Sequence, residues 1–380
     1  MNSLLLLVLL AAGVTADIPA DKLVDIPAEK LAAIKDRFIV IFEDDVDVDE
    51  LVSSLEFQAT SIGGKFDVAW KYRTTVKGMA VTLNERSLKL IRRMPGVRYI
   101  ETDTIATLFS VPWGLDRIDQ RDLPLNNGFD ITGTGAGVTI YVIDTGVRDT
   151  HEEFTGRARQ GPVDFVGDGA NGYDCYGHGT HCAGTAAGAI HGIARDAQIV
   201  SVRIFDCDGI GTAADVVAAI DHTTANAVLP AVFSMSFGVV ARKSVDEAVD
   251  RAVDRGIVAV AAAGNSDGNA CVYSPSRSEK AISVAASDSS DTRAYFSSYG
   301  ECVEIFAPGI NVESASPYSD SDIILMDGTS VACPHVAGVA AIHLGNGIPA
   351  ADVRKQIIDS ATNNRLSDTK TGTPNKLLYI

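Results

Sequence analysis

The sequence predicts an α/β protein, with a doubly wound, mostly parallel sheet that has helices on both faces, preceded by a small ferredoxin-like α+β domain. Two observations predict the larger part: several strand candidates are predominantly apolar, and helical stretches alternate with them. The third observation predicts the smaller part: residues 38–100 show strands and helices in the order β-α-β-β-α-β.

In the smaller part, an amphipathic helical stretch follows the acidic run Glu43–Glu50 and extends to Thr60. A second helix is capped by Asn84 and ends before Pro95-Gly96. The strands are expected at 38–42, 68–72, 79–83 and 97–100. Residues 101–110 show no clear periodicity, and we interpret them as a linker.

The larger part begins near Trp113, and its first strand candidate is Val138–Ile143. A strand at 323–326 leads through a Gly-Thr turn into a helical stretch at 331–344. The other expected strands are 199–204, 231–235, 257–262 and 281–285, and the other expected helices are 181–189, 212–225 and 244–255.

The chain has 380 residues, of which 46% are hydrophobic, enough for a large core and a second domain. Its net charge of −17 argues against nucleic acid as a partner and suits a protein that binds cations, although solubility alone would explain it. Leu4–Ala12 is apolar, and small residues precede a signal-peptidase site after Ala16. We therefore expect a secreted protein, with no membrane partner because no stretch is long enough to span a bilayer. The six cysteines allow 15 full pairings, and the sequence does not choose among them.

Four polar residues stand where an α/β sheet builds its site. Asp144 ends the first apolar strand, and His178 lies in Gly-His-Gly-Thr-His just before a helix. Ser330 lies at a helix start, where free backbone N–H groups could stabilise an oxyanion, and the amide of Asn265 follows another apolar strand. A hydroxyl, a base and a carboxylate are what nucleophilic catalysis requires, so the sequence predicts an Asp-His-Ser triad.

Each residue also has an ordinary explanation as a turn, a cap or a structural histidine. An aspartic protease would need a second Asp-Thr-Gly or Asp-Ser-Gly loop, and the sequence has none. Zinc at His178 and His181 is disfavoured because no His-Glu-x-x-His is present. The other alternative is a secreted binding protein on an inactive protease scaffold, which would be expected to lack one of the four residues.

The chain resembles the subtilisin-like serine proteases, in particular the proteinase K and aqualysin-type branch. The resemblance rests on the three triad motifs, on Ala262-Ala263-Gly264-Asn265, on Ser234–Gly238 and on Trp113–Gln120. Residues 37–105 resemble the inhibitory propeptide of that family. The resemblance implies a signal peptide at 1–16, a propeptide at 17–109 and a peptidase domain at 110–380. Val331 departs from the family, in which Met usually follows the serine.

By this resemblance, Ser330 is the nucleophile, His178 the general base and then acid, and Asp144 the residue that orients His178. Asn265 and the Ser330 N–H would form the oxyanion hole. The walls of the substrate pocket would be small and uncharged, which favours apolar or aromatic P1 residues in polypeptide substrates. Those walls are Ser236, Phe237, Gly238, Ala262, Ala263 and Gly264.

The resemblance also pairs Cys175 with Cys207 and Cys271 with Cys302, and leaves Cys182 and Cys333 as buried free thiols. It implies structural calcium. One set of ligands would lie at the start of the peptidase domain; a second would use Glu304 with the carbonyls of Glu279 and Ala281. We further expect a monomer whose own propeptide is an intramolecular inhibitor. The first set of ligands is Asp116, Asp119, Gln120 and Asn126.

Overall fold

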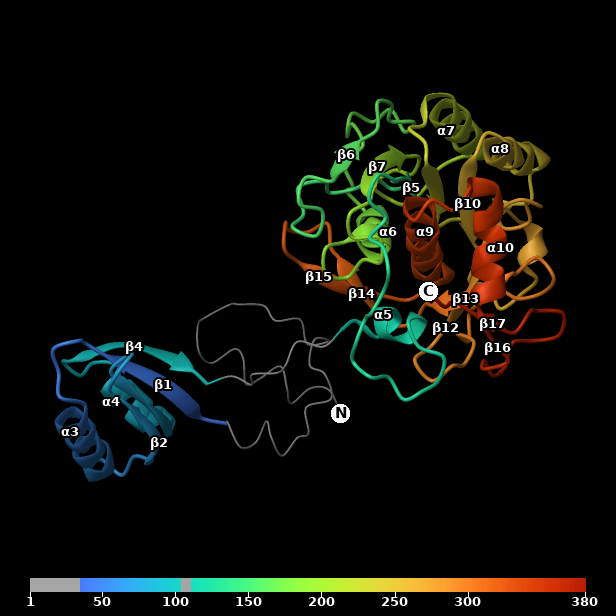
Figure 1. The fold of residues 1–380 in the computed structure, drawn as a ribbon. Helices are drawn as coiled ribbons and strands as arrows, with labels where there is room; N and C mark the ends of the chain where they lie inside the picture. Colours follow the sequence, from blue (N-terminus) through green and yellow to red (C-terminus); the bar gives the residue numbers. More distant parts are fainter. Residues whose placement is uncertain (1–34, 104–110) are drawn as a thin grey trace. The chain divides into compact units, whose positions relative to one another are not determined.

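The computed structural model describes residues 35–103 and 111–380. The chain divides into two compact units, Met1–Phe109 and Ser110–Ile380, which are drawn together in Figure 1 and treated separately below. The expected signal segment and leader lie outside the described residues, as does most of the linker. No helix among the described residues is long and apolar enough to cross a membrane.

The N-terminal unit has the expected β-α-β-β-α-β order. Its antiparallel sheet has the strand order β2-β3-β1-β4. Asp47 and Asn84 cap the two helices by accepting hydrogen bonds from backbone N–H groups of the first turn. Both helices bury apolar side chains in one cluster with the sheet, among them Leu55, Ile91 and Val81. The elements are β1 (Arg37–Phe42), α3 (Val48–Ser61), β2 (Phe66–Tyr72), β3 (Gly78–Leu83), α4 (Glu85–Ile91) and β4 (Val97–Thr102).

The described part of the C-terminal unit is built on one large sheet with the strand order β16-β17-β13-β12-β10-β8-β5-β7-β6. The pairings are parallel except between β16 and β17, as expected for a doubly wound fold. The strands are β5 (Thr139–Asp144), β6 (Ala158–Gln160), β7 (Gln198–Arg203), β8 (Ala231–Met235), β10 (Ile257–Ala262), β12 (Ile282–Ser287), β13 (Ile305–Pro308), β16 (Thr362–Asn363) and β17 (Lys376–Leu377).

Helices cover both faces of this sheet (Figure 1). Successive residues of β5 point to opposite faces, so Ile140 and Val142 are buried in one core cluster and Tyr141 and Ile143 in another. The first cluster contains residues of α6, α9 and α10, and the second contains residues of α7 and α8. The helices are α5 (Trp113–Ile118), α6 (His178–Ala187), α7 (Ala213–Asn226), α8 (Lys243–Asp254), α9 (Thr329–Gly345) and α10 (Ala350–Ser360).

Two small antiparallel pairs lie outside the large sheet. β14 (Val312–Ala315) pairs with β15 (Ile323–Met326), and β9 (Val239–Val240) pairs with β11 (Tyr273–Ser274), which follows the short helix η1 (Ala270–Val272). The hairpin of β14 and β15 leads directly into α9, so it positions the start of that helix.

The boundaries of two helices differ from the prediction in a way that matters for the site. Helix α6 begins at His178 rather than His181, and α9 begins at Thr329 rather than Val331. In both cases the apolar periodicity begins later than the helix, because the first turn carries polar residues. Glycines with positive φ, Gly177 at 110° and Gly328 at 153°, precede the two helices and allow the chain to enter them abruptly.

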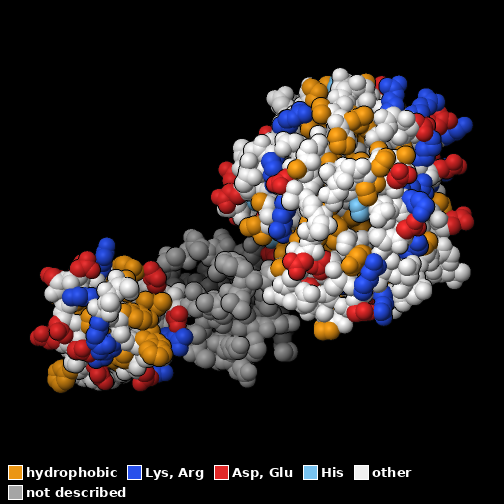
Figure 2. Space-filling view, in the orientation of Figure 1, with side chains coloured by type: hydrophobic (Ala, Val, Ile, Leu, Met, Phe, Trp, Pro, Cys, Tyr) orange, Lys and Arg blue, Asp and Glu red, His pale blue; other side chains and the backbone are white. Residues whose placement is uncertain are grey.

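Acidic and basic side chains are interspersed over the face of the C-terminal unit that Figure 2 draws. The net charge of −17 is therefore not gathered into one acidic patch on that face.

Candidate active site

Asp144 and His178 form a hydrogen-bonded pair at the carboxyl edge of the sheet. Asp144 is the last residue of β5, and His178 is the first residue of α6. The distance between His178 Nδ1 and Asp144 Oδ1 is 2.7 Å, and Oδ1 also accepts a hydrogen bond of 2.7 Å from the backbone N–H of Thr145. A proton on Nδ1 that is bound by Asp144 leaves Nε2 as the free, basic nitrogen of His178.

The surroundings of His178 favour its charged form. Burial alone would lower the pKa of His178, but the charge of Asp144 more than offsets it, so the pKa is raised well above its ordinary value. Cys182 lies one helical turn further along, with Sγ 3.9 Å from His178 Nδ1 and 3.4 Å from the Ser330 carbonyl oxygen. Burial raises the pKa of the Cys182 thiol. The thiol therefore lies between His178 and the backbone of Ser330.

Ser330 is the second residue of α9 and is half-buried. Its carbonyl accepts a 2.7 Å hydrogen bond from Ser236 Oγ as well as the contact with Cys182. Because the serine lies in the first turn, its backbone N–H has no partner four residues earlier within the helix. Ser330 can therefore present a hydroxyl and a free backbone donor at the same place.

Asn265 follows β10 and is fixed by the residue before Ser330. Its Oδ1 accepts hydrogen bonds from the Thr329 N–H (2.9 Å) and the Thr329 hydroxyl (2.8 Å), which leaves Nδ2 free to donate elsewhere. A methyl group placed on Gly328 would lie 3.3 Å from Asn265 Nδ2 and 3.4 Å from the Ser330 N. Two N–H donors thus flank one point next to the serine, an arrangement that can stabilise an oxyanion.

The two expected wall segments leave the sheet side by side. Ser236–Gly238 follows β8, and Ala262–Gly264 begins at the last residue of β10; these strands are parallel neighbours. The Tyr273 side chain approaches both segments, because a methyl group on Gly264 would meet its ring at 3.2 Å and one on Gly238 would meet it at 3.7 Å. Ser236, Ala262 and Ala263 are buried, whereas Gly238 is exposed.

Sequence reasoning missed two residues that fix this geometry. Asp174 is fully buried and accepts hydrogen bonds from the Thr145 hydroxyl (2.9 Å) and from the N–H groups of Gly177 (2.7 Å) and Thr180 (2.8 Å). It therefore ties the residue after Asp144 to both sides of His178. An aspartate four residues before His178, close to a helix start, is the signal that could have indicated it.

Thr329 is the second residue that was missed. Besides donating to Asn265, its hydroxyl accepts a 3.0 Å hydrogen bond from the Gly264 N–H. It therefore joins the end of β10 to the start of α9. A threonine just before a helix-start serine could have indicated this role, because such residues often bind nearby backbone groups.

The structure contains both expected disulfides, Cys175–Cys207 and Cys271–Cys302. The two remaining cysteines, Cys182 and Cys333, are free and buried, also as expected. His181 donates from Nε2 to the Val312 carbonyl at 3.0 Å, and burial lowers its pKa to about 3. This hydrogen bond holds the His181 ring against β14. A ring held in that way does not favour a zinc site shared with His178.

The first expected set of calcium ligands lies on α5, which carries Asp116, and in the segment that follows this helix. Asp119 Oδ2 accepts a hydrogen bond from the Asp130 N–H, while Oδ1 is buried without a hydrogen-bond partner among the described residues. Burial and the neighbouring carboxylate of Asp116 raise the pKa of Asp119. An unpartnered buried carboxylate oxygen beside a second carboxylate is what a calcium ion would satisfy, so these two residues fit the ion.

The other oxygens of that set already accept hydrogen bonds from backbone N–H groups. Asp116 accepts from the N–H groups of Asn126 and Asn127, and Gln120 Oε1 accepts from the Asn126 N–H at 3.2 Å. Asn126 Oδ1 accepts from the Gly128 N–H. These oxygens retain lone pairs for a cation, and the hydrogen bonds hold the loop in shape around Asp119.

The second expected set does not fit a calcium ion. Glu304 binds the guanidinium of Arg354 through both carboxylate oxygens, and the same guanidinium donates to the Glu279 carbonyl. Two of the three expected acceptors, Glu304 and the Glu279 carbonyl, are thus already bound to a cation supplied by the chain.

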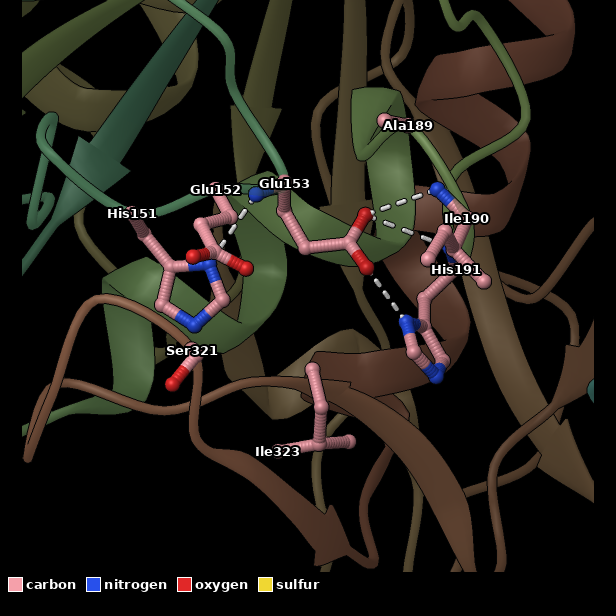
Figure 3. A pocket seen from close by; sticks show the side chains of 8 residues that line it. All are labelled: His151, Glu152, Glu153, Ala189, Ile190, His191, Ser321 and Ile323. Atoms are coloured by element: carbon pink, nitrogen blue, oxygen red, sulfur yellow. Dashed lines mark hydrogen bonds and ion pairs between the residues drawn. The ribbon is translucent and has the colours of Figure 1, made fainter. Parts of the chain in front are cut away.

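A cavity of about 130 Å³ lies at the other end of α6, away from His178 (Figure 3). The carboxylate of Glu153 points at His191 there, with 2.6 Å between Oε1 and Nδ1, and its Oε2 accepts from the Ile190 N–H. On the other side of the ring, Glu313 lies 3.7 Å from Nε2. His151 also lines the cavity, but both its ring nitrogens are engaged with the backbone, at Glu153 N and Asp322 O.

Comparisons with known proteins agree with this geometry. The model of the subtilase family matches residues 135–377, and the model of the peptidase inhibitor I9 family matches residues 37–109. An extracellular serine proteinase of Thermus sp. (strain Rt41A) is 40% identical over 91% of this chain and 90% of its own length. An alkaline serine exoprotease A of Vibrio alginolyticus is also 40% identical, over 91% of this chain and 68% of its own length.

Among solved structures, that of a cold-adapted subtilisin-like serine proteinase is similar, with a TM-score of 0.68 and 45% identity. The similarity covers 71% of this chain and 98% of the other. The family match covers more than half of the chain and coincides with the sheet that carries the site. The chain is therefore a serine endopeptidase of the subtilase family, in which an I9-type inhibitor domain precedes the peptidase domain.

Proposed function

We propose that Ser330, His178 and Asp144 are the catalytic triad of this endopeptidase. Asp144 holds His178 by Nδ1, so Nε2 can take the proton of the Ser330 hydroxyl as that oxygen attacks the peptide carbonyl. His178 then gives the proton to the leaving amine, and water repeats the sequence to release the acyl group. The 2.7 Å hydrogen bond between Asp144 and His178 is the observation that carries this proposal.

The oxyanion of each tetrahedral intermediate would be bound by Asn265 Nδ2 and the Ser330 N–H. These donors flank one point beside Gly328, and Thr329 fixes the Asn265 amide through its other end. A donor held in place before the reaction lowers the barrier without a cost of reorganisation at that moment.

We propose that the P1 side chain lies between Ser236–Gly238 and Ala262–Gly264, and that apolar or aromatic residues are preferred there. The walls carry no charge, and the Tyr273 ring lies against both glycines of the pocket. Peptide p-nitroanilides that differ only at P1 test this preference. Phe or Leu should give a higher kcat/KM than Arg or Glu, and a preference for Arg would contradict the proposal.

The chain is proposed to be a secreted zymogen that removes its own N-terminal unit. The signal segment would leave after Ala16, and the cut that releases the propeptide of residues 17–109 would fall at 107–111. The I9 match supports the role of residues 37–109 as an inhibitor, and the relatives that are named extracellular support secretion. Val111 N–H donates to Asn127 Oδ1, and the Trp113 indole donates to the Ile310 carbonyl, so the peptidase unit is anchored from Val111 onward.

Calcium is the proposed structural cofactor at Asp119 and Asp116, with Gln120 and Asn126 as further oxygen ligands. The buried, unpartnered Oδ1 of Asp119 supports this proposal. When bound, the ion would neutralise two carboxylates that the fold holds close together. We also propose that the mature enzyme is a monomer.

A fluorophosphonate probe tests the central proposal. It should label the processed enzyme at Ser330 in a 1:1 ratio and abolish peptidase activity in proportion to labelling. Mass spectrometry of the labelled peptide identifies the residue. Labelling of any other serine with the same loss of activity, or full activity after Ser330 is labelled, would rule out Ser330 as the nucleophile.

A further inference from the structure

Arg354 and Glu304 form a bidentate ion pair between a helix and the start of an inner strand of the large sheet. Glu304 directly precedes β13, and Arg354 lies on the first turns of α10. Arg354 Nε lies 3.1 and 3.0 Å from the two Glu304 carboxylate oxygens, and Nη2 also binds Oε1. The third nitrogen, Nη1, donates a 2.6 Å hydrogen bond to the Glu279 carbonyl.

The guanidinium thus binds a carboxylate and a main-chain carbonyl from two separate segments of the chain. A metal ion in this corner would use the same oxygens at 2.3–2.6 Å. An ion bound to oxygens of both Glu304 and Glu279 would lie next to the guanidinium that binds the same oxygens, and two cations in contact repel each other. Arginine and a metal ion therefore exclude each other at these acceptors.

Hydrogen bonds to α8 and β12 also hold the segments that contain Glu279 and Glu304. Ser278 Oγ donates to Asp250 Oδ1 of α8 at 2.6 Å, and the Lys280 N–H donates to the same oxygen at 3.2 Å. The Glu304 N–H binds the Ser283 carbonyl on β12. The Glu279 carbonyl is therefore part of a segment fixed by α8, by β12 and β13, and by Arg354.

We propose that Arg354 is a built-in replacement for a calcium ion at this corner of the peptidase unit. The planar guanidinium offers a permanent charge and five N–H donors, enough to bridge Glu304 and Glu279 without a metal. The stability contributed by Glu304 is then independent of calcium. This inference does not depend on which residues perform catalysis.

The test uses the full-length chain with Ser330→Ala, which prevents self-digestion, and measures thermal midpoints in EDTA and in excess CaCl2. Glu304→Gln should lower the midpoint by on the order of 2–5 °C, equally in both conditions, because Arg354 and not calcium holds this residue. Arg354→Ser should lower the midpoint in EDTA, and combining it with Glu304→Gln should add little further, because the two residues act as one unit.

Arg354→Ser should also gain a larger response to calcium than the parent has, because the oxygens that bound Arg354 are then open to a further ion. That gain should disappear when Glu304→Gln is added. Lys355→Ser is the matched control: it removes a cation from the next position of α10, where the side chain is 77% exposed and pairs only with Asp359, and its midpoint should stay within about 1 °C of the parent.

Two results would overturn the proposal. If Glu304→Gln reduces the calcium response of the parent, calcium rather than Arg354 binds Glu304. If Arg354→Ser and Glu304→Gln have fully additive effects in EDTA, the two side chains do not stabilise the corner as a unit. Calcium bound at other sites contributes equally to the thermal midpoint of every variant, so it does not change the differences between variants.

Discussion

His178 donates from Nδ1 to Asp144 Oδ1 at 2.7 Å, while Asp144 Oδ2 is buried without a hydrogen-bond partner among the described residues. Oδ1 of Asp144 therefore accepts the hydrogen bonds from both His178 and the Thr145 N–H. This geometry fixes the tautomer of the ring, and the negative charge raises the pKa of His178 against the effect of burial.

Asp144→Asn should consequently have two effects. The value of kcat should fall by roughly 10⁴-fold, because an amide can hold the imidazole in the wrong tautomer. The acidic limb of the pH–rate profile should move to lower pH, because His178 must be neutral to act as a base and its pKa falls without the charge of Asp144. Steady-state kinetics from pH 5 to 10 measure both.

Asp164→Asn is the matched control for that change. Asp164 also accepts hydrogen bonds from backbone N–H groups, at Val166 and Gly172, but it pairs with Arg203 and has no contact with His178. Its pH–rate profile should match that of the wild type. An equal shift of the profile in both variants would mean that Asp144 acts only through the overall charge.

Asn265→Asp should lower kcat by about 10²–10³-fold and leave KM nearly unchanged. The substitution keeps an oxygen that can accept from Thr329, but it replaces the Nδ2 donor with an oxygen that repels an oxyanion. Thr329→Ser keeps the hydroxyl that binds Asn265 and serves as the control, with activity near that of the wild type. A loss confined to KM would contradict a role in the transition state.

Removing Ser330 tests self-processing. Ser330→Ala deletes one hydroxyl from a half-buried position, so folding should survive while the nucleophile is lost. The chain should remain joined to its N-terminal unit, and the wild type should separate into two pieces, of which the smaller inhibits the larger. Gel electrophoresis and N-terminal sequencing after expression in a protease-free system check this. Processing of the Ser330→Ala chain there would mean that another group performs the cut.

Calcium should raise the thermal midpoint of the phosphonate-inhibited enzyme, because an ion that binds only the folded state stabilises it. Asp119→Asn should abolish much of that response. In EDTA the same variant should be as stable as the parent or more so, because burial disfavours the charged form of Asp119. Asp122→Asn, in the same loop but exposed, is the control and should respond to calcium normally. Equal responses in both variants would place the ion elsewhere.

The sequence predicted the fold well where one local pattern determined the outcome. The mainly apolar runs at Ala231–Met235 and Ile257–Ala262 coincide with β8 and β10, because a strand buried on both faces needs apolar residues along nearly its whole length. It missed β13, whose four residues end in a proline, and α10, whose amphipathic pattern is short. The starts of α6 and α9 were predicted too late in the sequence, because the first turn of each helix carries polar residues.

The residues of the candidate site could be predicted where each lies in a short sequence motif. Contacts between residues far apart in the sequence could not be predicted, because no local pattern encodes them. Arg354 lies 50 residues from Glu304, and the expectation of calcium at Glu304 took no account of a cation on a helix that was itself not foreseen. Asp174 likewise depends on three segments meeting at one carboxylate.

The pair of His191 and Glu153 should make stability depend on pH. Burial would lower the pKa of His191, but hydrogen bonds with Glu153 and Glu313 raise it to about 9. Because the folded pKa exceeds the unfolded value of about 6.5, the stabilisation is complete below that value and is lost as pH rises through 9. It amounts to on the order of 3 kcal/mol. Thermal midpoints of the Ser330→Ala chain should therefore fall between about pH 6.5 and 9, and His191→Gln should flatten that slope. The same slope in both chains would show that His191 is not responsible.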